Sequence, residues 1–169
     1  MANGCKYDHL AVDYLPPHCI DDEVVDQFIH AGPGPDGLWD YYYDVEDAYY
    51  GRNAFYDLET VEALARNGTK YYCSPEWHAG HCLYLWWKIE RGVVQMEWFD
   101  STHGSHCMGF VMQSWRQIVQ GDKPLPTCIA GQYRHQRDPD TGLMVRPDGD
   151  NDQCMELWRP GLPHNGDKK

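Results

Sequence analysis

The sequence has few positive charges, no long apolar run and little phenylalanine. Its 14 Lys and Arg face 26 Asp and Glu, which gives a formal net charge of −12. Nucleic acids and anionic membrane surfaces both bind basic patches, so neither is expected as a partner. No run approaches the roughly 20 apolar residues of a membrane-spanning helix, and the first twenty residues lack the apolar core of a signal peptide. We therefore expect a soluble chain without a membrane anchor.

Tryptophan, tyrosine and cysteine are abundant instead. The 169 residues include seven Trp, twelve Tyr and seven Cys, against four Phe. The length suits one core, so we predict a single domain over residues 1–169, with an N-terminal arm to about residue 17 and a Pro/Gly-rich tail from about 159. The many cysteines and an Asn67-Gly68-Thr69 glycosylation pattern favour an oxidising, secretory compartment. In such a compartment we expect most cysteines to be bridged.

Local patterns predict an α+β fold that is mainly helical, with short strands and long loops. Residues 21–30 and 57–67 have apolar residues at helical spacing, with acidic residues where the helices begin. Asn67-Gly68 is a typical helix end. Two further helices are predicted, one that includes LYLWWKIE and ends at Gly92, and one over CMGFVMQSWRQIVQ. Residues 69–77 look extended up to Pro75, and residues 93–99 have the composition of a strand.

The motif His-x-x-His-Cys occurs twice, as HAGHC at 78–82 and as HGSHC at 103–107. Each copy stands where an extended segment enters a predicted helix, so the first turns of two helices are expected to face each other. Residues three apart share a helix face, which would gather four imidazoles at one site. Imidazole is a ligand for Zn, Cu, Fe and Ni. The motif predicts a metal site whose ligands and catalytic residues are His78, His81, His103 and His106.

The identity of the metal depends on the neighbouring residues. Structural zinc would recruit cysteine thiolates, but Cys82 and Cys107 each lie about 100° round the helix from the preceding histidine, which favours a core or disulfide role. Neither motif contains Asp or Glu, although Glu76 and Asp100 are near enough to leave a two-His-one-carboxylate iron site open. A histidine-only set in an oxidising compartment favours copper, which leads the affinity order, with zinc as an alternative.

The chain resembles the UstYa family of fungal secondary-metabolite enzymes, whose mark is two His-x-x-His-Cys motifs that each open a helix. Both are intact here, as HAGHCLYLWWKI and HGSHCMGFVMQSW. The segments YLPPHC, GPGPDGLWD, GDKPLP and QCMELW are similar to further elements of the family. Two features differ: VMQSW replaces the usual Leu-Arg-Gln after the second motif, and Val119 stands where the family usually has a cysteine. Members usually carry a membrane anchor facing the lumen; the sequence has no such segment in residues 1–169, so we expect either a trimmed chain or a soluble variant.

The resemblance implies oxidative tailoring of a peptide or other small metabolite by cyclisation, hydroxylation or chlorination of unactivated carbon, with copper as cofactor. It carries the ligand role onto His78, His81, His103 and His106. We expect one or two copper ions, O₂ as the oxidant and a location in the secretory lumen or outside the cell.

The abundance of aromatic residues adds a prediction about the substrate. We expect Trp77, Trp98 and Tyr42 to wall a pocket over the metal. Two alternatives remain. One is a zinc hydrolase with Glu76 or Asp100 as general base. The other is a non-catalytic module whose metal or disulfides only stabilise the fold.

Overall fold

The structure is a computed structural model that describes residues 4–93, 101–124, 126–129, 136–137 and 144–145. The side chains of residues 101–103, 136–137 and 144–145 lie outside the described part. Along the chain the elements are β1 (Lys6–Asp8), β2 (Asp13–Leu15), α1 (Asp22–Ile29), β3 (Tyr41–Tyr42), α2 (Val45–Tyr50), α3 (Leu58–Asn67), β4 (Tyr71–Cys73), α4 (Pro75–Glu90), α5 (Ser101–Gln120), β5 (Thr127–Ile129), β6 (Gln136–Arg137) and β7 (Met144–Val145). The mainly helical α+β fold is confirmed, because the strands are short and pair antiparallel.

The helices begin at the predicted capping residues. The Asp21 carboxylate accepts a hydrogen bond from the backbone N–H of Val24 at the start of α1, and Asp57 caps α3 in the same way. Gly68 ends α3 in the left-handed conformation, with φ of 68°. Such a φ is strained for residues with a Cβ. The predicted strand over residues 93–99 lies almost wholly outside the described residues.

The N-terminal segment is a β-hairpin and not the predicted arm. β1 and β2 pair antiparallel, with Tyr7 opposite Tyr14. Tyr7, Leu10 and Val12 are all buried in the main core. The prediction of an arm to residue 17 was therefore wrong, because this segment buries too much apolar surface to leave the domain.

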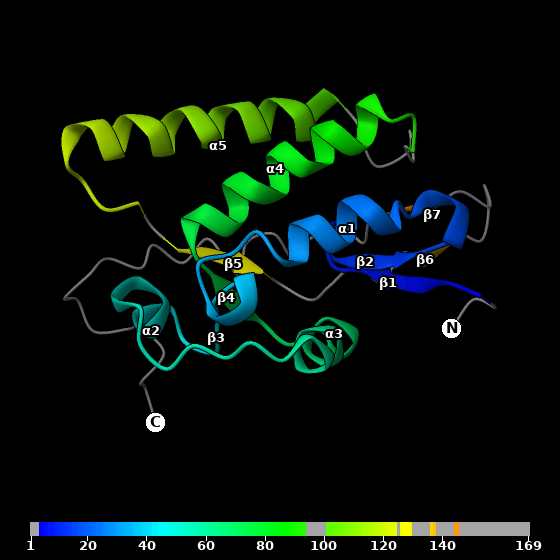
Figure 1. Cartoon of the computed structure of the whole chain (residues 1–169), viewed down its shortest axis with the longest axis horizontal. Coiled ribbons are helices and arrows are strands. Elements are labelled where there is room, and N and C mark those ends of the chain that lie inside the picture. Colours follow the sequence, from blue (N-terminus) through cyan, green and yellow to red (C-terminus); the bar gives the residue numbers. More distant parts are fainter. Residues whose placement is uncertain (1–3, 94–100, 125, 130–135, 138–143, 146–169) are drawn as a thin grey trace.

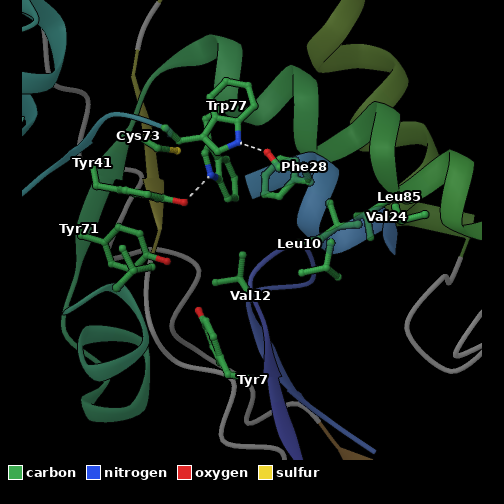
Figure 2. Close-up of a cluster of buried hydrophobic side chains, with 13 residues drawn as sticks. Tyr7, Leu10, Val12, Val24, Phe28, Tyr41, Tyr71, Cys73, Trp77 and Leu85 are labelled. Carbon is green, nitrogen blue, oxygen red and sulfur yellow. Dashed lines mark hydrogen bonds between the residues drawn. The ribbon is translucent and has the colours of Figure 1, made fainter. Parts of the chain in front are cut away.

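Trp77 lies at the centre of the core, between the helices and the three-stranded sheet β3-β4-β5 (Figure 2). Its ring packs edge-on against Phe28 of α1, with 5.6 Å between ring centroids. Its indole N–H donates to the hydroxyl of Tyr41 from β3 at 3.1 Å. The first motif helix is thus held against both α1 and the sheet by the residue that precedes His78.

The two motif helices, α4 and α5, pack side by side and run in opposite directions (Figure 1). The contacts show the same direction: Cys82 meets Cys107, whereas His78, one turn earlier on α4, meets Phe110 further along α5. The two motif segments therefore lie against each other, with His78 in the first turn of α4 meeting residues from the second turn of α5 onward. None of the helices in the described ranges has the length and apolarity needed to span a lipid bilayer.

Candidate metal centre

One histidine from each motif meets its counterpart across the α4–α5 interface. Nε2 of His78 lies 3.2 Å from Nε2 of His106, and the two rings are inclined by 29°, with centroids 5.2 Å apart. His78 is almost wholly buried, whereas His106 is exposed on α5. The doubled motif thus brings together two imidazole nitrogens from two consecutive helices.

The separation of these two nitrogens suits ligands of one metal ion. Metal–imidazole bonds are about 2.0–2.1 Å long, so two nitrogens of a tetrahedral site lie about 3.3 Å apart. The observed 3.2 Å is close to this value. It also suits a hydrogen bond between the two rings, so the distance fits a metal pair without requiring one.

His81 lies one turn further along α4, with its ring fixed on two sides. Its Nδ1 is 2.7 Å from the backbone carbonyl oxygen of Leu10, and its ring stacks on Trp77 with an interplanar angle of 10°. The His81 and His78 ring centroids are 6.1 Å apart. His81 therefore borders the pair, and its Nδ1 is already occupied by the hairpin.

His78 also has two further contacts that hold its ring. Its Nδ1 lies 3.0 Å from the hydroxyl oxygen of Thr127 in β5, and Phe110 stacks on its ring with centroids only 3.7 Å apart. Sequence reasoning missed both residues. Phe110 could have been found, because it lies four residues after His106 and so on the same face of α5. Thr127 gave no such signal.

The motif cysteines are buried where the two helices meet, and the surroundings of Cys82 disfavour its thiolate. Cys82 and Cys107 have no exposed surface. A hydrogen bond with Cys107, together with burial, raises the pKa of the Cys82 thiol far above its ordinary value. Since metals bind the thiolate, this environment favours the imidazoles as ligands and agrees with the core role predicted for these cysteines.

The expectation that most cysteines are bridged was wrong. Cys128 is disulfide-bonded, with its partner outside the described residues. The other described cysteines are present as thiols: Cys5, Cys19, Cys73, Cys82 and Cys107. Four of these five are buried, where cysteine packs as a small apolar side chain. The glycosylation candidate Asn67 is exposed at the end of α3, and its modification stays a prediction.

The predicted pocket residues have different positions. Trp77 is a core residue with 2 % of its surface exposed, so it supports His81 from inside the fold and does not wall an open pocket. Tyr42 is buried in β3, where burial, followed by the nearby charge of Asp40, raises its pKa to about 12. Its neighbour Tyr41, pointing to the other face of the strand, is the one that reaches Trp77. Trp98 lies outside the described residues.

His103 is part of α5, one turn before His106, but its side chain lies outside the described part. Among the side chains that the structure describes, no three or more His, Cys, Asp or Glu residues form a group that could hold a metal. The described candidate ligands therefore form a pair, and the four-histidine site stays a prediction. Glu76 is exposed in the first turn of α4, and Asp100 is not among the described residues.

A separate cavity of about 840 Å³ lies among the hairpin, α1 and α3. It is lined by charged and aromatic side chains that include His9, Tyr14 and Arg66, and none of the four motif histidines borders it. This cavity is therefore not the predicted pocket over the metal.

Comparison with known proteins gives no relative: no family model, no curated protein and no solved structure matches this chain.

Proposed function

We propose that this chain is a copper-dependent oxidoreductase of the kind found in the UstYa family, which tailors a peptide or other small metabolite at unactivated carbon. The observation that carries the proposal is the 3.2 Å separation between Nε2 of His78 and Nε2 of His106, one from each motif. Copper is favoured because an imidazole nitrogen from each helix meets at the site, and because the hydrogen bond with Cys107 and burial hold the pKa of the Cys82 thiol far above its ordinary value. The sequence resemblance supplies the reaction class.

The residues of the chain would divide the work around the metal. His78 and His106 would bind it, with His103 and His81 as the further candidate ligands from the same motifs. Phe110 and Trp77 pack against the histidine rings and limit the positions that those rings can take. The exposure of His106 leaves the α5 side of the site open to solvent, where a substrate could approach. When bound, copper would supply the one-electron chemistry with O₂ that oxidation of a C–H bond needs.

The test is metal loading of the whole chain and of a matched pair of histidine variants. Protein prepared without chelator is incubated with Cu²⁺ or Zn²⁺, freed of excess metal and subjected to element analysis. We expect wild-type protein to retain at least one copper ion and His106→Ala to lose it. Because His106 is exposed, its replacement should leave the free energy of unfolding within about 0.5 kcal/mol of wild type. His30→Ala is the control, since His30 is exposed at the end of α1 and contacts Asp26 instead of the motif.

Catalysis is tested separately, by O₂ consumption with ascorbate as reductant. Copper-loaded wild-type protein and His30→Ala should consume O₂, and His106→Ala should not exceed the rate of free copper. Preferential retention of zinc would instead favour the hydrolase alternative. Retention of no metal by wild-type protein would overturn the proposal and leave a non-catalytic module.

A further inference from the structure

We infer that the hydroxyl of Thr127 and the backbone carbonyl of Leu10 are positioning groups that fix which nitrogen of His78 and His81 faces the proposed metal. The inference rests on the proposed function, since it assigns the roles of ring nitrogens at the same site. A neutral imidazole has one protonated and one unprotonated nitrogen, and only the unprotonated nitrogen binds a metal. The partner of Nδ1 therefore decides whether Nε2 is available.

The hydrogen-bond partner of His81 determines which of its two ring nitrogens carries the proton. A backbone carbonyl can only accept a hydrogen bond, so Nδ1 of His81 must donate to Leu10 across the 2.7 Å contact. In neutral His81, Nε2 is then unprotonated. Stacking on Trp77 restricts the rotation of the ring, so this tautomer is presented in one orientation.

The Leu10 carbonyl is itself held by a buried charge pair. One carboxylate oxygen of Asp8 accepts hydrogen bonds from the backbone N–H groups of Leu10 and Ala11, both at 2.9 Å. The other accepts from the Lys88 ammonium at 2.7 Å. Lys88 lies seven residues after His81, so both residues are on the same face of α4. The hairpin thus contacts this face of α4 at two points. The Leu10 carbonyl accepts from His81, and the Asp8 carboxylate accepts from Lys88.

His78 is oriented from the opposite side by β5. Thr127 pairs with Cys73 of β4, and Cys73 stands just before Ser74, whose side chain caps α4. The strand that carries the hydroxyl is therefore joined directly to the strand that leads into the motif helix. The Thr127 hydroxyl can accept or donate, and we assign it as the acceptor from Nδ1–H of His78. Nε2 of His78 is then unprotonated and faces His106 at 3.2 Å. In metal-free protein His106 then donates its Nε2–H across that contact, and metal binding at Nε2 would require that proton to move to Nδ1 of the same ring.

The experiment compares Thr127→Val, which keeps the branched shape but loses the hydroxyl, with Thr127→Ser, which keeps the hydroxyl. Long-range ¹⁵N–¹H NMR of metal-free protein reads the tautomer of each histidine, and competition with a chelator gives the Cu²⁺ affinity. In wild-type protein both His78 and His81 should carry the proton on Nδ1. Thr127→Val should lose the fixed tautomer of His78 and bind Cu²⁺ about 10- to 100-fold more weakly. Thr127→Ser should resemble wild type, and His81 should be unchanged in both variants.

Two outcomes would overturn the positioning role while leaving the proposed function standing. One is a wild-type protein in which His78 or His81 carries its proton on Nε2, and the other is a Thr127→Val variant that binds Cu²⁺ as tightly as wild type. A wild-type protein that binds no copper would overturn the proposed function, and the assigned roles toward a metal would fail with it. The unfolding midpoint of each variant separates loss of affinity from loss of fold.

Discussion

Replacing Lys88 with Met should destabilise the protein strongly, because it leaves a buried carboxylate without its counter-ion. Asp8 has no exposed surface and Lys88 only 5 %, and their charged atoms are 2.7 Å apart. Removing one partner of a buried ion pair costs about 3–5 kcal/mol. Asp8 keeps its two backbone N–H donors, so we expect the lower end, about 3 kcal/mol. This is a large share of the roughly 5–15 kcal/mol by which domains are stable.

A second variant tests whether the charge is the cause. In the double variant Asp8→Asn, Lys88→Met, the amide oxygen can still accept from the N–H groups of Leu10 and Ala11, and no charge is left buried. Since neutral replacements of buried pairs are often tolerated, we expect it within about 1 kcal/mol of wild type. Lys6→Met is the control, because its partner Asp22 and Lys6 itself are both exposed, and such pairs contribute under about 1 kcal/mol.

Urea unfolding at pH 7, followed by tryptophan fluorescence, measures all three variants. The reasoning is refuted if Lys88→Met costs less than about 1 kcal/mol, or if the double variant is as unstable as the single one. The first result would mean that the Asp8 carboxylate is not sealed from water. The second would mean that the methylene chain of Lys88 supplies the stability, and not its charge.

Two further predictions concern glycines of the two motif helices and His9 of the N-terminal hairpin. Gly80→Ala should lower the urea midpoint, because its Cβ would lie 3.0 Å from the ring of Trp39, whose indole N–H is anchored to the Phe28 carbonyl. Gly109→Ala meets nothing within 4 Å and should gain up to about 1 kcal/mol from helix propensity; a gain at Gly80 would contradict this packing. Burial lowers the pKa of His9 below its ordinary 6.5, so the unfolded chain binds the proton more readily. Its contribution to stability is complete above pH 6.5 and is lost as the pH falls. His9→Gln should therefore lose less stability than wild type between pH 7.5 and 5.5, and an equal loss would rule His9 out.

The helices could be predicted because their signals are local. Asp21 and Asp57 cap helices within three residues of themselves, and the spacing of the doubled motif sufficed to anticipate that the two motif segments lie against each other. The N-terminal hairpin could not be predicted in this way. Its turn contains Val12 at φ of 58°, a conformation in which a β-branched residue is an outlier. A sequence pattern assigns such turns to Gly or Asn, so this one gave no signal.

The candidate site was predictable only in part, for a related reason. His78 and His106 follow from the motif, but their surroundings come from distant segments. Leu10 contributes a backbone carbonyl, which any residue type carries, and Thr127 comes from a three-residue strand. Neither leaves a residue-type pattern. Trp77 was expected at a pocket because it precedes the motif, but its helical position directs it into the core.

The contacts of the N-terminal hairpin with α4 also have a consequence for the order of folding. His81 and Leu10 are separated by 71 residues, and Lys88 and Asp8 by 80, whereas His78 and His106 are separated by 28. Closing a long loop has a larger entropy cost and slows folding. The two motif helices can thus meet while the chain is still partly unfolded, but the rings of His81 and its neighbours become fixed only when the first residues of the chain return to α4. We therefore expect the N-terminal hairpin to close over the histidines after the two motif helices have met.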